Sequence, residues 1–276
     1  MPRAGWERFE ASLWQTTSLL VHGDGESLVV DPAITTDEVE AIAARALELG
    51  APVRHVLITH VHWDHVCGIG AFPEAVAAMS EETAAAVTSG DAAESVRRAA
   101  EAYSVEVPGS PRVDRTIVRG SAVELGPFRI ETFPLLGHAA DTTGFRLREQ
   151  GLLVVGDHLS AVEFPFVTSP AAYRMTLAGL IEMLQADPPA TVIPGHGPPL
   201  EVAEALAVAA ADLAYLRSLH AAVVGALAAG GSREDAKAAA LAVDPPRPCA
   251  PDLEEMRGFN AERQVDEIVA PAEATA

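Results

Sequence analysis

Three histidines and an aspartate lie within six residues of one another in this chain. They are His60, His62, Asp64 and His65, and they directly follow an apolar run that ends at Ile58. A buried turn cannot satisfy so many polar groups by hydrogen bonds alone, and neutral imidazole and carboxylate are ligands that zinc prefers. Because residues two apart in an extended segment can point to the same side, the spacing predicts a metal site at the end of a strand.

This motif resembles the signature of the metallo-β-lactamase-fold hydrolases, and in particular their generic β-lactamase-like-2 and glyoxalase-II-like groups. The resemblance covers about residues 12–200 and rests on three further phrases, Gly137-His138, Gly156-Asp157-His158 and Pro194-Gly195-His196-Gly197. Each phrase lies where an apolar strand gives way to a turn, the usual place for site residues on a rigid scaffold. The resemblance implies an α/β fold, the αββα sandwich, with extra helices at the C-terminal end.

The resemblance also implies a set of ligands and a reaction. Two zinc ions per chain are expected, with iron or manganese as alternatives. A hydroxide that bridges the two metals, oriented by Asp64, would cleave an ester, lactone or thioester of a small molecule. The implied first metal is held by His60, His62 and His138, the second by Asp64, His65 and His196, and Asp157 bridges them.

Five other functions within the same fold stay open, and each makes a different demand on the chain. A glyoxalase-II-like hydroxyacylglutathione hydrolase needs a basic patch for the glutathione carboxylates. A persulfide dioxygenase with a single iron uses a set similar to His60, His138 and Asp157. A phosphodiesterase or nuclease needs a basic channel. A flavodiiron protein has a carboxylate at the position of His62, and a non-catalytic module would lack ligands, of which none is missing here.

Several neighbouring residues can bind metals or substrates but are expected to be structural. His158 adjoins Asp157, and neighbours in a strand point to opposite sides, which predicts packing rather than ligation. Cys67 is predicted to be a buried, unreactive thiol. Trp63 and the phrase Phe164-Pro165-Phe166 either line a substrate pocket or simply pack. The remaining histidines on apolar patterns are interpreted as structural: His22, His55 and His220.

The elements that must position these residues can be outlined from turn and capping signals. A hairpin over residues 12–31 turns at Gly23-Asp24-Gly25, and Thr35 with Glu38 forms a capping box for a helix that ends near Leu49. The strand before the motif spans 53–59. Further on, the pattern predicts a short strand over 75–79, alanine-rich helices over 81–103, the first strands of a second sheet over 112–133, a hairpin over 143–155, a helix over 170–185 capped by Ser169, a strand to 194, and helices over 200–229 and 232–242.

Composition limits the partners and the compartment. The chain has 276 residues, is 49% hydrophobic and carries a net charge of −20, which argues against binding to nucleic acid. Two distant cysteines, no export signal and no apolar run near 18 residues predict a cytoplasmic protein with no membrane contact. We expect one domain over 1–243 (core 12–200, helical extension 200–243), followed by a linker and tail over 244–276. A small-molecule substrate is the expected partner, and the oligomeric state is open, with a homodimer as one option.

Overall fold

The computed structural model describes residues 5–269, and the chain divides into two compact units. The first comprises Met1–Pro134, Asp141–Gly156 and Pro189–Leu200; the second comprises Leu135–Ala140, Asp157–Pro188 and Glu201–Ala276. The predicted domains 1–243 and 244–276 each have one end outside the described residues. Those two domain boundaries stay predictions.

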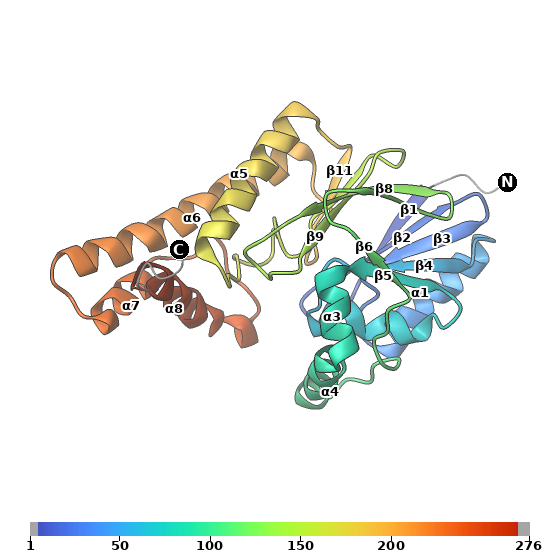
Figure 1. Ribbon diagram of the computed structural model, residues 1–276, viewed down its shortest axis with the longest axis horizontal. Helices are drawn as coiled ribbons and strands as arrows, with labels where there is room; N and C mark the ends of the chain where they lie inside the picture. Colours follow the sequence, from blue (N-terminus) through green and yellow to red (C-terminus); the bar gives the residue numbers. More distant parts are fainter. Residues whose placement is uncertain (1–4, 270–276) are drawn as a thin grey trace. The chain divides into compact units, whose positions relative to one another are not determined.

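The described part of the first unit contains two β-sheets (Figure 1). The first sheet has the order β1 (Gly5–Glu10), β2 (Thr17–Gly23), β3 (Glu26–Val30), β4 (Val53–Leu57), β5 (Val76–Ser80) and β6 (Arg115–Ile117). The second has the order β11 (Thr191–Ile193), β10 (Leu152–Val154), β9 (Thr143–Leu147), β8 (Phe128–Pro134) and β7 (Ala122–Leu125). Strands β3 to β6 run parallel to one another, and β10 and β11 form the other parallel pair. The candidate ligands of this unit follow β4 and β11, both members of parallel pairs.

The two sheets share an apolar core. Leu19 and Val21 of β2 point into it with Phe128 and Phe145 of the second sheet, and all four are fully or almost fully buried. Leu20, between the first two, belongs instead to a second core on the other face of the first sheet. This alternation is the two-residue period of a strand, and it makes the first unit a sandwich.

Helices supply the second core of the first unit. They are α1 (Thr36–Glu48), α2 (Trp63–Val66), the 3-10 helix η1 (Cys67–Ala71), α3 (Glu81–Ser89) and α4 (Asp91–Tyr103). The predicted capping box opens α1: Thr35 accepts from the backbone of Glu38, whose side chain accepts from the Thr35 backbone. Val39, Ile42 and Ala46 are fully buried on one face of this helix. The helical spacing of these residues therefore anchors α1 on the sheet.

The described part of the second unit is helical. It contains α5 (Pro170–Ala186), α6 (Val202–Ala228), α7 (Arg233–Leu241), the 3-10 helix η2 (Pro251–Leu253) and α8 (Met256–Val269). Helix α6 packs against α5, α7 and α8 (Figure 1). The predicted tail thus contains a docked helix, α8, whose Asn260, Ala261, Gln264 and Val265 are buried.

Helix α6 is long and apolar enough, by length and composition alone, to cross a membrane. The expectation that no apolar run approaches the length of a membrane span therefore does not hold for α6. The same helix carries Asp212, which is 1% exposed and pairs with Arg247 of the following segment. A core helix that packs against three others passes the same test of length and composition, so this feature by itself does not indicate a membrane.

Most predicted elements are present, but several details differ. Asp64 and His65 lie on the short helix α2 rather than on an extended segment. Strand β6 belongs to the first sheet, although the pattern over residues 112–133 was expected to open the second. Strand β1 has no counterpart among the predicted strands; it carries three charged residues and forms one edge of its sheet. Ser169 precedes α5 as expected but forms no capping hydrogen bond with its side chain.

Candidate metal centre

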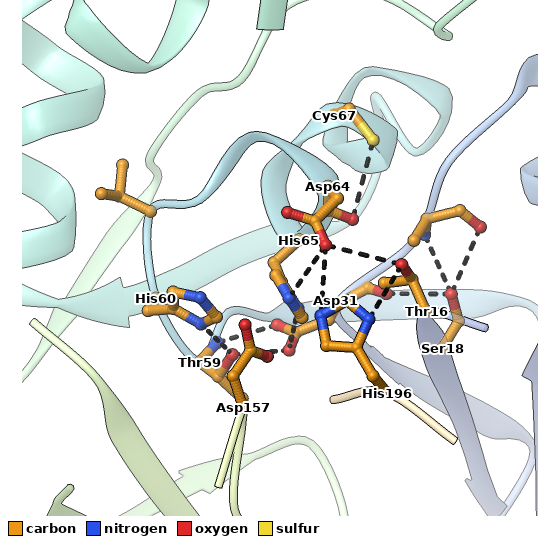
Figure 2. A network of polar contacts seen from close by, with 12 residues as sticks. Thr16, Ser18, Asp31, Thr59, His60, Asp64, His65, Cys67, Asp157 and His196 are labelled. Carbon is orange, nitrogen blue, oxygen red and sulfur yellow. Dashed lines mark hydrogen bonds and ion pairs between the residues drawn. The ribbon is translucent and has the colours of Figure 1, made fainter. Parts of the chain in front are cut away.

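The histidine motif begins where β4 ends, and the side chain of Asp31 holds it by hydrogen bonds. Asp31 follows β3 and adopts a left-handed backbone conformation (φ 48°), which Asp tolerates better than most residues. Its carboxylate accepts hydrogen bonds from the Thr59 backbone N–H at 2.8 Å and from the Thr59 hydroxyl at 2.6 Å. It also accepts from Nδ1 of His65 at 3.0 Å (Figure 2). One buried carboxylate thus fixes both ends of the motif.

Asp64, His65 and His196 form a compact cluster in the first unit (Figure 2). Their ligand atoms all lie within 4.8 Å of one another, and the three residues are at most 4% exposed. Oδ2 of Asp64 lies 3.3 Å from Nε2 of His65 and 3.5 Å from Nε2 of His196. Such separations suit atoms that share one small cation, since zinc ligands lie about 2.0–2.2 Å from the metal.

The ring of His60 extends this cluster. Its centroid lies 4.3 Å from that of His65 and 4.5 Å from that of His62. His60 is fully buried, whereas His62 is partly exposed. The backbone N–H of Val61, between His60 and His62, donates to the carboxylate of Asp141 at 2.8 Å. Asp141 also accepts from the Thr83 hydroxyl at 2.9 Å, so the loop is fixed to helix α3.

His196 is positioned by the loop between β1 and β2. The Thr17 backbone donates to the Gly195 carbonyl at 2.7 Å, and Nδ1 of His196 lies 3.2 Å from the Trp14 carbonyl oxygen. Trp14 and the residue after it both have positive φ angles, 56° and 53°. Backbone strain of this kind persists where surrounding contacts enforce it and is common at functional sites. The strained backbone of this loop therefore places the Trp14 carbonyl where it can hold His196.

His138 and Asp157 lie together in the second unit. Nε2 of His138 is 3.0 Å from Oδ2 of Asp157, and Nδ1 of His138 is 3.0 Å from the Phe166 carbonyl oxygen. Gly137 precedes the histidine with φ +115°, and a Cβ atom there would lie 2.3 Å from the backbone of Tyr173. Only glycine fits that approach. The predicted sharing of metals between these two residues and those of the first unit stays a prediction.

The donor set fits metal ions, because a common pattern of hydrogen bonds fixes four imidazoles. In each, Nδ1 faces an oxygen that can accept its hydrogen: Thr59 Oγ1 for His60, Asp31 for His65, Trp14 for His196 and Phe166 for His138. The Thr59 hydroxyl hydrogen is already directed to Asp31, so Thr59 accepts from His60. With Nδ1 as the donor, Nε2 of each ring carries the lone pair that a metal would take, as is usual in protein metal sites. In three of the rings Nε2 lies 3.0–3.5 Å from a carboxylate oxygen, of Asp64 for His65 and His196 and of Asp157 for His138.

The neighbours expected to be structural are packed as such. His158 is fully buried, and its ring lies against Tyr173 with the centroids 4.5 Å apart. Cys67 is fully buried as well, and burial raises the pKa of its thiol well above the ordinary value. Trp63 packs on Trp14 and Tyr103, with centroids 5.6 and 5.7 Å away. Trp63 is partly exposed, so it can still border an entrance.

Sequence reasoning did not single out Asp31, Asp141 or Thr16. Thr16 directs its hydroxyl toward Asp64 Oδ2 at 3.5 Å and the Leu13 carbonyl at 3.1 Å. Asp31 had a usable signal, because an acidic residue directly after an apolar strand is the feature that singled out Asp157. Thr16 and Asp141 show no comparable signal in the sequence.

Comparison with known families agrees with this geometry. Residues 11–196 match the family model of the metallo-beta-lactamase superfamily, a range that includes all seven candidate ligands. The chain belongs to the metallo-beta-lactamase superfamily. Among curated proteins of the superfamily, hydroxyacylglutathione hydrolase of Rhodospirillum rubrum is 29% identical over 49% of this chain and 43% of its own length. The alignment therefore spans less than half of that relative.

A second relative in the superfamily is covered more fully. The acyl-coenzyme A thioesterase MBLAC2 of Gallus gallus is 28% identical over 69% of this chain and 75% of its own length. Among solved structures, the metallo-beta-lactamase family protein TTHA1429 of Thermus thermophilus matches 95% of this chain and 91% of its own, with a TM-score of 0.66 and 21% identity. ETHE1 from Myxococcus xanthus matches with a TM-score of 0.56 and 18% identity over 76% of this chain and 84% of its own. These structures confirm the predicted fold class.

Proposed function

We propose that this chain is a binuclear metal-dependent hydrolase that cleaves a small-molecule thioester, ester or lactone, with thioesters as the first class to test. The observation that carries the proposal is the set of four buried imidazoles with Nδ1 directed to fixed acceptors. Two curated relatives, a hydroxyacylglutathione hydrolase and an acyl-coenzyme A thioesterase, have names that denote action on thioesters. Those names support thioesters ahead of the other two classes.

The chemistry divides between the metals and the protein. Divalent metals held by the histidines, Asp64 and Asp157 would act as Lewis acids toward a carbonyl group and a water molecule. Asp64 is 4% exposed and lies between His65 and His196, where its carboxylate can orient the attacking water. Water adds to the acyl carbon, the carbon–sulfur bond breaks, and a carboxylic acid and a thiol leave.

Two metals rather than one are favoured by the Asp64, His65 and His196 cluster. A persulfide dioxygenase with one iron needs only a set like His60, His138 and Asp157. In such an enzyme Asp64, His65 and His196 would bind no metal. Their ligand atoms lie within 4.8 Å of one another in a buried site. Burying a carboxylate beside two imidazoles without a cation is unfavourable. This cluster supports the binuclear hydrolase over the mononuclear dioxygenase.

The glutathione branch of the superfamily is less well supported than other acyl thioesters. A glutathione site needs cations for two carboxylates, and the basic residues of the C-terminal region include Arg233 and Lys237. Both pair with Glu262 of α8, and Arg233 also pairs with Asp266. The two acids neutralise the positive charges of Arg233 and Lys237, which would otherwise attract the carboxylates of glutathione. We therefore expect a substrate whose thiol portion is not bound by Arg233 and Lys237.

Metal analysis joined to a substrate panel tests the proposal. We expect about two zinc ions per chain, turnover of acyl thioesters that stops on chelation, and recovery when zinc is returned. The variant His65→Gln should lose metal and at least about 100-fold in kcat, because a bound metal supplies several kcal/mol of transition-state stabilisation. His55→Gln is a matched control, because His55 lies on β4 itself, before the motif, and pairs with Glu26. One iron per chain with oxygen consumption on a persulfide would overturn the proposal.

A further inference from the structure

The C-terminal helix α8 reaches the loop that carries the hydrogen-bond partner of His138. Asn260 of α8 is 1% exposed, and both ends of its amide are bonded to that loop. Its Nδ2 donates to the Pro165 carbonyl at 2.6 Å, and its Oδ1 accepts from the Val167 backbone N–H at 2.9 Å. The two bonds lie on either side of one residue, Phe166. The buried amide of Asn260 therefore holds the backbone on both sides of Phe166.

Phe166 is the residue whose carbonyl oxygen faces His138. That oxygen lies 3.0 Å from Nδ1 of the imidazole. The loop that carries His138 is joined to the same segment, because the Gly137 carbonyl accepts from the backbone of Thr168 at 2.8 Å and of Ser169 at 3.1 Å. The direction of the Phe166 carbonyl therefore decides whether Nδ1 of His138 is held by a hydrogen bond, with Nε2 on the side of Asp157, 3.0 Å from its Oδ2.

The segment before α5 is held by hydrogen bonds rather than by regular structure. Residues 155–169 contain no helix or strand, and an irregular segment of that length can take several conformations unless side chains fix it. Its fixed points include the bonds to Gly137 and the bond from the Tyr173 hydroxyl to the Asp157 carbonyl, and others come from the C-terminal residues. Asn260 bonds at Pro165 and Val167, and Nε of Arg247 donates to the Glu163 carbonyl at 2.6 Å. Residues of the C-terminal linker and tail thus contribute some of the contacts that regular structure would supply elsewhere.

We propose that Asn260 is a positioning residue of the metal centre, acting through Phe166 to fix the orientation of His138 and the hydrogen bond at its Nδ1. The assignment rests on the proposed function, in which His138 is a metal ligand. The C-terminal helix α8 would then help to position a metal ligand, although it lies outside the residues that match the family model. The substrate and the reacting atoms need not touch Asn260.

Two variants and a matched control separate positioning from simple stability. Asn260→Leu removes both bonds at similar volume, and Asn260→Asp keeps the acceptor for Val167 but places an oxygen against the Pro165 carbonyl. The control is Gln264→Leu, one turn along the same helix. Gln264 is fully buried and bonds to Arg174, Glu267 and His220, but to no residue of the loop. Both leucine variants should lower the melting temperature of the metal-free protein.

The readouts are the Nδ1 chemical shift of His138, from long-range nitrogen NMR of the metal-free protein, and zinc affinity, from competition with a chelator. We expect the shift of a hydrogen-bonded Nδ1–H in the wild type and in Gln264→Leu, and a changed shift in both Asn260 variants. Zinc affinity should fall about 10-fold in the Asn260 variants only, as for other outer partners of a ligating histidine.

Equal changes in the Asn260 variants and in Gln264→Leu, or an unchanged Nδ1 chemical shift of His138 in both Asn260 variants, would overturn the assignment. Absence of zinc binding by the wild type would instead overturn the proposed function. In that case the NMR comparison in the metal-free protein still decides whether Asn260 orients His138.

Discussion

At the scale of single residues, the candidate centre depends on acceptors as much as on ligands. His65 is held by Asp31, which also accepts two hydrogen bonds from Thr59. His60 donates in turn to the Thr59 hydroxyl. Asp31 therefore determines the direction of two imidazoles, one by direct contact and one through Thr59. A change at Asp31 should alter the metal site without removing a ligand.

Replacing Asp31 tests this dependence. Asp31→Asn keeps a residue type that tolerates positive φ but presents one acceptor oxygen in place of two. We expect metal affinity to fall about 10- to 100-fold, the usual effect of losing a partner of a ligating histidine. Chelator competition on the purified protein measures it. Asp114→Asn, at an acid that accepts from the Ala77 backbone, is the control. Unchanged metal affinity in Asp31→Asn would contradict the role of Asp31.

The same residues show how far sequence reasoning reached. The candidate ligands could be named because four of them share one short motif and the others end apolar strands. Their partners could not, because Thr16, Asp141 and Asn260 are brought to the centre by pairing and packing between segments far apart in the chain. Asn260 lies 93 residues from Val167, whose N–H it accepts. No local pattern encodes such a contact.

At the scale of elements, local signals placed the helices better than the sheets. The capping box at Thr35 and the serine before α7 act within four residues, so each is visible in the sequence. Strand β6 was expected in the second sheet because its apolar pattern continues toward β7 and β8. Its partner is β5, reached only after two helices, and nonlocal pairing of this kind leaves no local trace.

Gly137 offers a test of how α5 and the His138 loop fit together. Gly137→Ala would place a methyl group 2.3 Å from the Tyr173 backbone at a φ of +115°. Strain and overpacking of this kind each cost about 1–3 kcal/mol, so the free energy of unfolding should fall by about 3 kcal/mol or more. Urea unfolding of the metal-free protein measures the change.

A second glycine on α5 itself serves as the control for that experiment. Gly179 lies in the helix interior, and nothing lies within 4 Å of the position that its Cβ would take. Gly179→Ala should therefore stabilise the protein by about 0.5–1 kcal/mol, because alanine favours a helix. A Gly137→Ala protein as stable as the wild type would contradict the close approach of Gly137 to the Tyr173 backbone of α5.

At the scale of the whole molecule, the chain is strongly acidic and a few of its acids are buried, Asp212 of α6 among them. The chain carries a net charge of −20, and most of its carboxylates can remain in water. Asp212 cannot, since it is 1% exposed on the inner face of α6. Burial raises the pKa of Asp212 to about 7, while the Arg247 guanidinium beside it pulls the pKa in the opposite direction. Part of the stability of the protein should therefore depend on pH near neutrality.

The sign of that dependence follows from proton binding. In the unfolded chain Asp212 loses its proton near its ordinary pKa of 3.8, but in the fold it keeps the proton to about pH 7. Between these values the folded state binds more protons, so the contribution of Asp212 to stability falls as pH rises, by at most about 1.4 kcal/mol per pH unit. Asp212→Asn, which resembles the neutral acid, removes this term. The stability of the wild type minus that of the variant should decline from pH 5 to pH 7 and then level off.

Urea unfolding of both metal-free proteins at several pH values measures that difference. Glu255→Gln removes one exposed carboxylate and controls for the change in total charge. Its stability should run parallel to that of the wild type across the same range. A difference between the wild type and Asp212→Asn that grows with pH would mean that the ionised pair with Arg247 outweighs burial. The ionised acid would then hold Arg247, which donates to the Glu163 carbonyl, more firmly as pH rises.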